Sequence, residues 1–515
     1  MTVIDDKDTE GLAQFGYKQE LERSLGSFSS FAAGFSYISI MTGVFQLFYF
    51  GFGSGGPAFI WSWPLVFLGQ LAVACCFAEM AGQYPLCGSV YQWSKNIARP
   101  ITSWMAGWIM IIGAIVTVAA VAVAYQIILP QVWTGFEVIG GPDDVGVSST
   151  PAGAKNAILL ALVLVAFTTV VNIVGVRLMA RINNFGVAVE LIGSVVLILC
   201  LAVHIRRGPG LVFDTNGTGH GQSLGYLGAF LVASLMSAYV FYGFDTAGSL
   251  AEETVNPRKH APRAILRAIT AAFLVGGIMM VVGMMAVGNL HAKELTTSGM
   301  PYLLKSTLGN TLGDVFLVCS AIAITVCCLA VQTAAIRMIF SMARDERLPF
   351  GSVLARVSPR SKTPVVPAIV TGLLAVLLLV VNIGNQRVFL ILTSMAIILF
   401  YIPYLMVTFP MLLKRLRGQW PRAEHGPHFS MGRWGLPVNI VAVLYGALMT
   451  VNLALPRVEV YGNDHWYFQW GAILFTAVIV AIGALILVVT KRHRITPTTS
   501  LEPGPGAGAS EEVGA

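Results

Sequence analysis

The chain has 515 residues, of which 56% are hydrophobic and only 11% are charged. Ordinary soluble domains carry about 25% charged residues. This composition excludes a soluble fold at this length.

Apolar segments long enough to cross a bilayer, about 20 residues each, recur twelve times along the chain. They predict an all-α integral membrane protein with twelve transmembrane helices that is surrounded by a lipid bilayer. The expected spans lie near 28–50, 57–81, 101–130, 156–176, 184–204, 223–251, 263–290, 310–342, 365–384, 388–413, 435–456 and 468–490.

Both ends of the chain are expected to be solvated tails. Residues 1–27 mix both signs of charge and lack the apolar region and cleavage site of a signal peptide. Residues 491–515 end in "EPGPGAGASEEVGA", which is too poor in large apolar groups to fold. The seven cysteines are odd in number and, apart from Cys87, fall in predicted spans. No disulfide framework is therefore expected.

Lys and Arg residues are unevenly divided between the two sides of the membrane. Short loops rich in these residues are retained in the cytoplasm. With the N-terminus inside, 25 of the 32 Lys and Arg residues fall in cytoplasmic segments. Topology therefore accounts for the net charge of +7, and nucleic acid is not expected as a partner. The prediction is a multi-pass protein of the cell (plasma or inner) membrane with both termini in the cytoplasm.

Two predicted spans carry small and polar residues where a lipid-facing helix would carry leucine. Span 1 contains Thr42 and Gly43 in "SYISIMTGVFQLFYFGFGSGGP", and span 6 contains Gly243 and Asp245 in "VFYGFDTAGSLAEETVNPRKHAPRAI". Backbone that leaves the helix in a bilayer is tolerated only where protein or a water-filled cavity satisfies its polar groups. The two interruptions together predict a cavity, although Thr42 and Gly43 taken alone are better explained by close packing between helices.

The interrupted spans each begin a set of five spans, 28–204 and 223–413, and two further helices follow at 435–490. Because five is odd, the second set would lie upside down relative to the first, as in many secondary transporters. In those proteins the binding site lies between the repeats, where helix N-termini face an anionic group and free carbonyls face a cation. A zwitterion fits both.

Asp245 is a candidate for the binding of a substrate amine and for proton coupling, since a proton could replace the amine in the empty state. A carboxylate near the membrane centre costs about 2.5–3.5 kcal/mol and is rarely present without a pairing, hydration or transport role. Asp245 is expected either to line the cavity beside the substrate or to cap a half-helix or bond to another span.

Glu190, in "RINNFGVAVELIGSVV", is a candidate for proton coupling. It lies about two turns from the cytoplasmic entry of span 5, if that span begins near Asn184. Burial disfavours the charged form of a carboxyl group, so Glu190 could take up and release a proton. The alternative is a contact with Arg177 or Arg181 that only fixes span 5.

Three further acidic residues, Glu79, Glu252 and Glu253, lie at predicted cytoplasmic ends of spans. They are expected to form salt bridges with the basic loops or an inner gate. The sequence lacks the motifs of metalloproteases, serine hydrolases and phosphate-binding loops. We therefore expect neither an enzyme nor ATP-driven transport, and no cofactor or metal.

Four stretches together resemble the amino acid, polyamine and organocation (APC) transporters, within the branch of amino-acid, gamma-aminobutyrate and choline permeases. The resemblance implies a leucine-transporter type fold, a 5+5 inverted repeat with broken helices 1 and 6, and it extends from about residue 15 to 490. The stretches are "GFSYISIMTGVFQLFYFGFGSGGPAFIWSWP", "AEMAGQYPLCGSVYQWSKNIARP", "FYGFDTAGSLAEETVNPRKHAPRAI" and "IRMIFSMARDERLPF".

The resemblance also implies a substrate site between the broken helices. Span 1 would offer backbone groups to a substrate carboxylate, and span 6 would receive the amine and supply an aromatic lid. The implied residues are Ser39, Ile40, Met41, Thr42 and Gly43 in span 1, and Tyr239, Phe241, Tyr242, Gly243, Phe244 and Asp245 in span 6. At the position of Glu190 some relatives carry a lysine that stands in for a sodium ion, and this chain departs from that pattern.

The expected function is secondary active transport of amino acids or related amines by alternating access, with a proton as the coupling ion. Two alternatives remain open. One is a permease or exchanger for choline, gamma-aminobutyrate or polyamines, and the other is a membrane sensor that keeps the fold without moving solute. Symport and antiport, and coupling to protons or sodium, also remain open.

Overall fold

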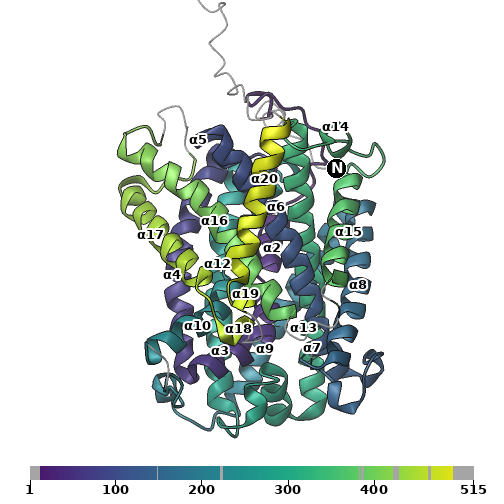
Figure 1. Cartoon of the computed structure of the whole chain (residues 1–515), viewed down its shortest axis with the longest axis vertical. Coiled ribbons are helices and arrows are strands. Elements are labelled where there is room, and N and C mark those ends of the chain that lie inside the picture. The colour runs from purple at the N-terminus through teal and green to yellow at the C-terminus, as the bar shows by residue number, and fades with distance from the viewer. Residues whose placement is uncertain are drawn as a thin grey trace, which may run out of the picture.

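The computed structural model describes residues 12–147, 149–220, 224–381, 383, 388–421, 428–461 and 466–490. Within these ranges the chain forms a bundle of helices, and its only β-type pairing is a single bridge between Leu25 and Thr254 (Figure 1). Residues 1–11 and the predicted tail 491–515 lie outside the described residues.

The bundle is built from fourteen helices within the described ranges. In chain order they are α2 (Ser27–Ile38), α3 (Ile40–Gly55), α4 (Ser62–Gln83), α6 (Pro100–Val123), α7 (Tyr125–Val132), α8 (Pro151–Val174), α9 (Val176–Ala202), α10 (Tyr226–Val240), α12 (Pro257–Ala286), α13 (Met300–Arg344), α15 (Val365–Val381), α16 (Val388–Leu416), α17 (Gly435–Ala454) and α20 (Gly471–Thr490).

Shorter elements connect these helices. They are η1 (Pro57–Trp61), α5 (Ser89–Ile97), η2 (Thr134–Phe136), η3 (Pro142–Asp144), η4 (Pro209–Phe213), α11 (Thr246–Ser249), η5 (Ala251–Glu253), η6 (Lys293–Leu295), α14 (Gly351–Leu354), η7 (Gly432–Trp434), α18 (Val458–Tyr461) and α19 (Trp466–Gln469).

The predicted all-helical membrane architecture is confirmed in its main feature. Within the described ranges, ten helical segments are long and apolar enough to cross a membrane. The expected spans near 223–251 and 365–384 contain the shorter apolar helices α10 and α15. The count of twelve crossings and the inverted repeat remain predictions.

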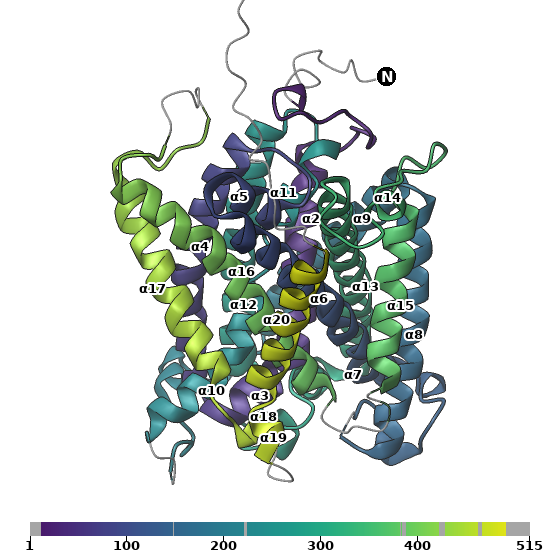
Figure 2. The ribbon, with the colours of Figure 1, turned by 45° about the horizontal axis from the view of Figure 1, so that its top comes forward.

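The bundle has a central and an outer set of helices (Figures 1 and 2). In the most apolar part of the segment formed by α2 and α3, 94% of the residues are buried, against 22% in α20. Outward positions of α17 and α20 carry exposed apolar side chains, among them Leu448, Leu485 and Val488. A bilayer requires such an outer surface, because the apolar side chains face hydrocarbon there instead of water.

The helices of the two predicted repeats pack against each other in a regular way. Four of the first five predicted spans contact the span that follows five places later. The pairs are α3 with α10, α4 with α12, α6 with α13 and α8 with α15.

One end of the bundle, here called the N-terminal face, carries residues 12–26, α5 and the C-terminal end of α20 (Figures 1 and 2). Residues 12–26, which the sequence places in a solvated tail, pack against this face. Leu12, Leu21 and Leu25 are buried. The backbone N–H groups of Ser24 and Leu25 donate to the carbonyl of Glu253 at 3.0 and 2.9 Å.

The acidic side chains at this face pair with basic residues from other segments, as the sequence predicts. Glu253 forms a bidentate pair with Arg337 (2.7 and 3.2 Å), and both side chains are buried. Three more ion pairs join Glu252 with Arg344, Glu79 with Arg415, and Asp345 with Lys95. These pairs connect α4, α5 and η5 with α13 and α16.

Tyr17 lies among these charges. Its hydroxyl donates to Asp345 (2.7 Å) and accepts from Lys95 (2.9 Å), and the Arg344 guanidinium stacks over its ring at 4.0 Å. Burial, together with the neighbouring Asp345 carboxylate, raises the pKa of Tyr17. The hydroxyl therefore keeps its proton and joins the N-terminal segment to α5 and to the end of α13.

We predict that Glu253→Gln lowers the free energy of unfolding by about 3–5 kcal/mol, because it leaves the buried Arg337 charge without a counter-ion. The matched control is Glu22→Gln, which breaks a pair with Arg177, a side chain that is 72% exposed. That change should cost about 0–1 kcal/mol. Unfolding midpoints in detergent measure both effects, and equal shifts would contradict the prediction.

Candidate functional site

The first helix break lies at Ser39, between α2 and α3. Ser39 has φ 35° and ψ 98°, outside the helical region. Its hydroxyl accepts from the N–H of Thr42 at 3.3 Å and so caps α3.

The expected position of this break, at Thr42 and Gly43, is therefore wrong by about three residues. Both lie within the first turn of α3. A Cβ atom at Gly43 would lie 2.5 Å from Cγ2 of Val240, the last residue of α10. Gly43 is small because two helices approach closely there, which was the alternative explanation of this pair.

The second break follows α10 and confirms the expected interruption at Gly243. Gly243 has φ 86°, and a Cβ atom added to it would lie 1.8 Å from Cδ1 of Tyr37. Its N–H donates to the hydroxyl of Tyr404 at 2.8 Å. Because Tyr37 lies in the last turn of α2, the two breaks meet at this contact.

Asp245 ends the second break and is 1% exposed. Its two carboxylate oxygens accept from the hydroxyls of Ser89 (2.8 Å) and Tyr404 (2.6 Å). Asp245 therefore bonds to segments other than its own, as the structural alternative requires. It also lines a pocket, so the two interpretations of this residue are compatible.

The pocket beside Asp245 has a volume of about 10 Å³. This is room for about one water molecule and is far below the roughly 300–1,000 Å³ of typical ligand sites. Its walls come from α2, α6, α11, α13 and α16, and include Tyr37, Thr246, Ser249, Met338 and Phe400.

Glu190 lies in the middle of α9, which begins at Val176 and is therefore longer toward the N-terminal face than the sequence predicts. Its Oε1 accepts from the backbone N–H of Met41 (2.9 Å) and lies 3.0 Å from the Ser39 hydroxyl. Its Oε2 is buried and has no hydrogen-bond partner among the described residues. Glu190 is 0% exposed, and its hydrogen bonds are with the first break.

The predicted rim contact of Glu190 is not present among the ion pairs of the described residues. Arg177 pairs instead with Glu22 of the N-terminal segment. Glu190 therefore bonds the N-terminus of α3, the end of the helix where the backbone dipole favours negative charge.

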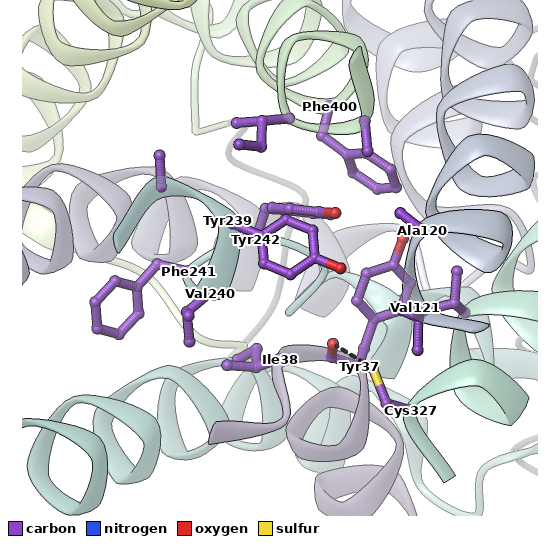
Figure 3. Close-up of a cluster of buried hydrophobic side chains, with 14 of the residues drawn as sticks. Tyr37, Ile38, Ala120, Val121, Tyr239, Val240, Phe241, Tyr242, Cys327 and Phe400 are labelled. Atoms are coloured by element: carbon purple, nitrogen blue, oxygen red, sulfur yellow. Dashed lines mark hydrogen bonds between the residues drawn. The ribbon is translucent and has the colours of Figure 1, made fainter. Parts of the chain in front are cut away.

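Aromatic rings surround the meeting point of the two breaks (Figure 3). Tyr242 lies 6.0 Å from Tyr37, 5.8 Å from Tyr239 and 4.6 Å from Phe400, measured between ring centroids. The Tyr37 and Tyr239 hydroxyls are buried without a hydrogen-bond partner among the described residues. These rings form a mostly apolar enclosure with two unpaired donors.

The other two aromatic residues predicted from span 6 point elsewhere. Phe241 packs against Trp63 at 4.3 Å and is turned away from the tyrosines in Figure 3. Phe244 packs against Tyr404 at 5.4 Å.

Sequence reasoning missed four residues of this region. Ser89 and Tyr404 hold Asp245, Phe400 closes the aromatic group, and the Cys327 thiol donates to the carbonyl of Tyr37 at 3.4 Å. They belong to segments distant in sequence from the breaks. Local patterns in the sequence contain no signal for such contacts.

The described part of the chain contains no group of three or more His, Cys, Asp or Glu side chains that could hold a metal ion. The arrangement combines hydrogen-bond donors at a helix N-terminus, a buried carboxylate and aromatic rings. Such a set can bind a small molecule that carries both a charged and an apolar part.

Comparison with known proteins gives the family. The family model "Amino acid permease" matches residues 25–479. The chain is 29% identical to amino-acid permease BAT1 of Arabidopsis thaliana over 88% of this chain and 89% of that protein. It is 26% identical to amino-acid permease 2 of Neurospora crassa, over 88% of this chain and 82% of the relative. It is also 26% identical to the branched-chain amino acid permease BcaP of Bacillus subtilis, over 85% and 89%.

The matched residues contain both helix breaks, Glu190 and the whole aromatic group. The resemblance to the APC transporters is thereby confirmed. The chain belongs to the amino acid permease family and is a multi-pass membrane transporter of that family.

Proposed function

We propose that this protein is a secondary active transporter that moves amino acids or related amines by alternating access, coupled to protons. The observation that carries this proposal is the meeting of two helix breaks at the contact between Tyr37 and Gly243. In secondary transporters, broken helices of this kind supply free backbone groups to substrate and ions.

The packing of the helices supports an inverted repeat, with units 28–204 and 223–413. An axis in the membrane plane that relates two five-helix units would make each span the counterpart of the span five places later. Four counterpart pairs are in contact, namely α3 with α10, α4 with α12, α6 with α13 and α8 with α15. We infer a leucine-transporter type fold with twelve crossings on this basis.

The charge distribution supports a cytoplasmic N-terminal face in a plasma or inner membrane. Residues 12–26 and the end of α20 lie at one end of the bundle, as an even number of crossings requires (Figures 1 and 2). The ion pairs of Glu253 and Glu252 with Arg337 and Arg344 would then close the inner side. Opening to the cytoplasm would require these pairs to separate.

The donors and acceptors at the breaks support a zwitterionic substrate. The first turn of α3, from Ser39 to Gly43, would bind its carboxylate, since a helix N-terminus favours an anion. The segment from Tyr239 to Asp245 would bind its amine through carbonyls and the Asp245 carboxylate. Tyr242 and Tyr239 would cover the apolar part.

A second candidate is a permease or exchanger for amines without a carboxylate, such as choline or polyamines. The Met41 N–H, a donor that a substrate carboxylate would need, is already bonded to Glu190. Aromatic rings close to an acidic residue also suit an organic cation.

Uptake into proteoliposomes tests the proposed function. The purified protein should accumulate members of a radiolabelled amino-acid mixture, and an inward proton gradient should increase accumulation. Uptake of amines alone would favour the second candidate. Binding without any uptake would indicate a sensor and contradict transport.

We predict that Gly243→Ala reduces the rate of uptake by on the order of 100-fold, since a Cβ atom there would displace Tyr37 and misalign the two breaks. Gly225→Ala is the matched control, because Gly225 also has positive φ (54°) but has no atom within 4 Å of the added Cβ. Both variants carry backbone strain of about 1–3 kcal/mol, because both glycines have positive φ. Equal loss of uptake in the two would assign the effect to strain alone.

We predict that Glu190→Gln retains exchange of labelled for unlabelled substrate but loses accumulation driven by a pH gradient. The amide keeps the size and shape of the Glu190 side chain but cannot carry a proton across. Counterflow and gradient-driven uptake in the same vesicles separate the two activities. A variant that concentrates substrate like the parent would give Glu190 a structural role only.

We predict that Asp245→Asn weakens binding of amines by about 1.5–3 kcal/mol, the range for a hydrogen bond to a charged group. In the parent a proton competes with the amine for Asp245, so the affinity for amines should fall as pH falls. The variant should lose this dependence. Scintillation proximity binding between pH 5 and pH 8 measures both effects, and unchanged affinity would mean that Asp245 serves only Ser89 and Tyr404.

A further inference from the structure

Glu190 occupies the place where a substrate carboxylate would bind. The Met41 N–H lies in the first turn of α3, where it has no partner within the helix, and it donates to Glu190 Oε1 at 2.9 Å. The Ser39 hydroxyl lies 3.0 Å from the same oxygen. The next N–H, of Thr42, is bonded to Ser39 Oγ. A substrate carboxylate can reach the Met41 N–H only if Glu190 leaves it.

Glu190 belongs to no ion pair among the described residues, and neither α2 nor α3 contains a charged side chain. One titratable group, Tyr37, lies next to the break that Glu190 bonds. A second, Cys327 on the adjoining α13, donates to the carbonyl of Tyr37. Ionised Glu190 is thus held by hydrogen bonds to the α3 terminus and not by a counter-ion.

The helices that pack against α9 are α2, α3, α8, α12 and α13, and the last three carry charged side chains. Glu190 lies 14 residues into α9, about 21 Å along its axis. The charged residues are Lys155 on α8; Arg258, Lys259, Arg263 and Arg267, together with His260, on α12; and Lys305, Asp314, Arg337 and Arg344 on α13. On α9 itself, Arg177 and Arg181 lie in the first two turns.

The second oxygen of Glu190 gives an independent indication. Oε2 is buried and has no partner among the described residues, although a buried carboxylate oxygen without a donor is costly. Oε1 thus bonds the α3 terminus, and Oε2, which has no donor, is free to take up a proton.

We propose that Glu190 competes with the substrate carboxylate for the N-terminus of α3, and that a proton on Glu190 admits the substrate. Without the proton, two carboxylates would share one set of donors, and like charges at one site repel. With the proton, neutral Glu190 releases the Met41 N–H, and the substrate carboxylate accepts it. Glu190 thus takes up one proton from solution for each substrate carboxylate that binds. This inference rests on the proposed function and deepens it, because it ties proton coupling to one group of the substrate.

The proposal separates two classes of substrate by the sign of their pH dependence. The affinity for a carboxylate substrate falls as pH rises above the titration of Glu190, by up to about tenfold per pH unit for one linked proton. An amine without a carboxylate lacks this dependence. If its affinity depends on pH through Asp245, that affinity falls as pH falls, because a proton on Asp245 competes with the amine.

The test uses L-leucine and L-arginine beside isoamylamine and agmatine, the same molecules without their carboxylates. Binding to the full-length protein in detergent is measured from pH 5.5 to pH 8.5. The parent should lose affinity for both amino acids as pH rises, whereas Glu190→Gln should show no such loss. Glu190→Met, which is also neutral, gives the same comparison if the first variant fails to fold.

The matched control is Glu137→Gln, which removes a carboxylate that bonds Gln126, outside the site. It should keep the parent's pH dependence. The proposal is overturned if the neutral variants at position 190 keep that dependence, or if the amines lose affinity with rising pH as the amino acids do. If the parent binds neither amino acid but binds the amines, or binds none of the four, the amino-acid function itself fails for these substrates.

Discussion

The fold depends on one constraint, which is that backbone leaving a helix inside the membrane must still satisfy its polar groups. At the first break the Ser39 N–H bonds back to Phe35, the Met41 N–H bonds Glu190, and the Thr42 N–H bonds the Ser39 hydroxyl. At the second break the Gly243 N–H bonds the hydroxyl of Tyr404. Side chains from α9 and α16 therefore supply what the interrupted helices lack.

The need to satisfy the backbone polar groups at the two breaks also explains why the breaks lie together. Tyr37 fills the space that a side chain at Gly243 would need, and Tyr404 bonds both Gly243 and Asp245. Moving either break would expose polar groups that other helices now satisfy. The surrounding helices therefore form a frame, and the ion pairs at the N-terminal face fasten that frame at one end.

Much of the architecture was predictable because helix length and hydropathy are local properties of a sequence. Every expected span contains an apolar helix. Gly243 and Glu190 could be identified because a glycine or a glutamate does not suit a lipid-facing helix. The first break was misplaced because the sequence signal, a small residue in a bulky stretch, is the same for a break and for close packing. Gly43 packs against Val240, whereas the break falls on Ser39, which carries no such signal.

The partners of the site residues could not be predicted, because they lie far away in sequence. Asp245 is bonded to residues 156 and 159 positions away, and Glu190 to residues 149 and 151 positions away. The packing of residues 12–26 was missed for a similar reason. Their mixed charges are typical of a solvated tail. In the folded bundle, however, Tyr17 donates to Asp345 and Leu21 is buried.

In the proposed coupling, a substrate carboxylate and Glu190 use the same helix terminus between the two breaks. An electron cryomicroscopy structure with a transported amino acid bound at pH 5.5 would show which group occupies that terminus. We expect the substrate carboxylate on the N–H of Met41 and the hydroxyl of Ser39, with Glu190 no longer accepting from Met41. A bound amino acid located elsewhere, with the bond between Glu190 and Met41 intact, would rule out this competition.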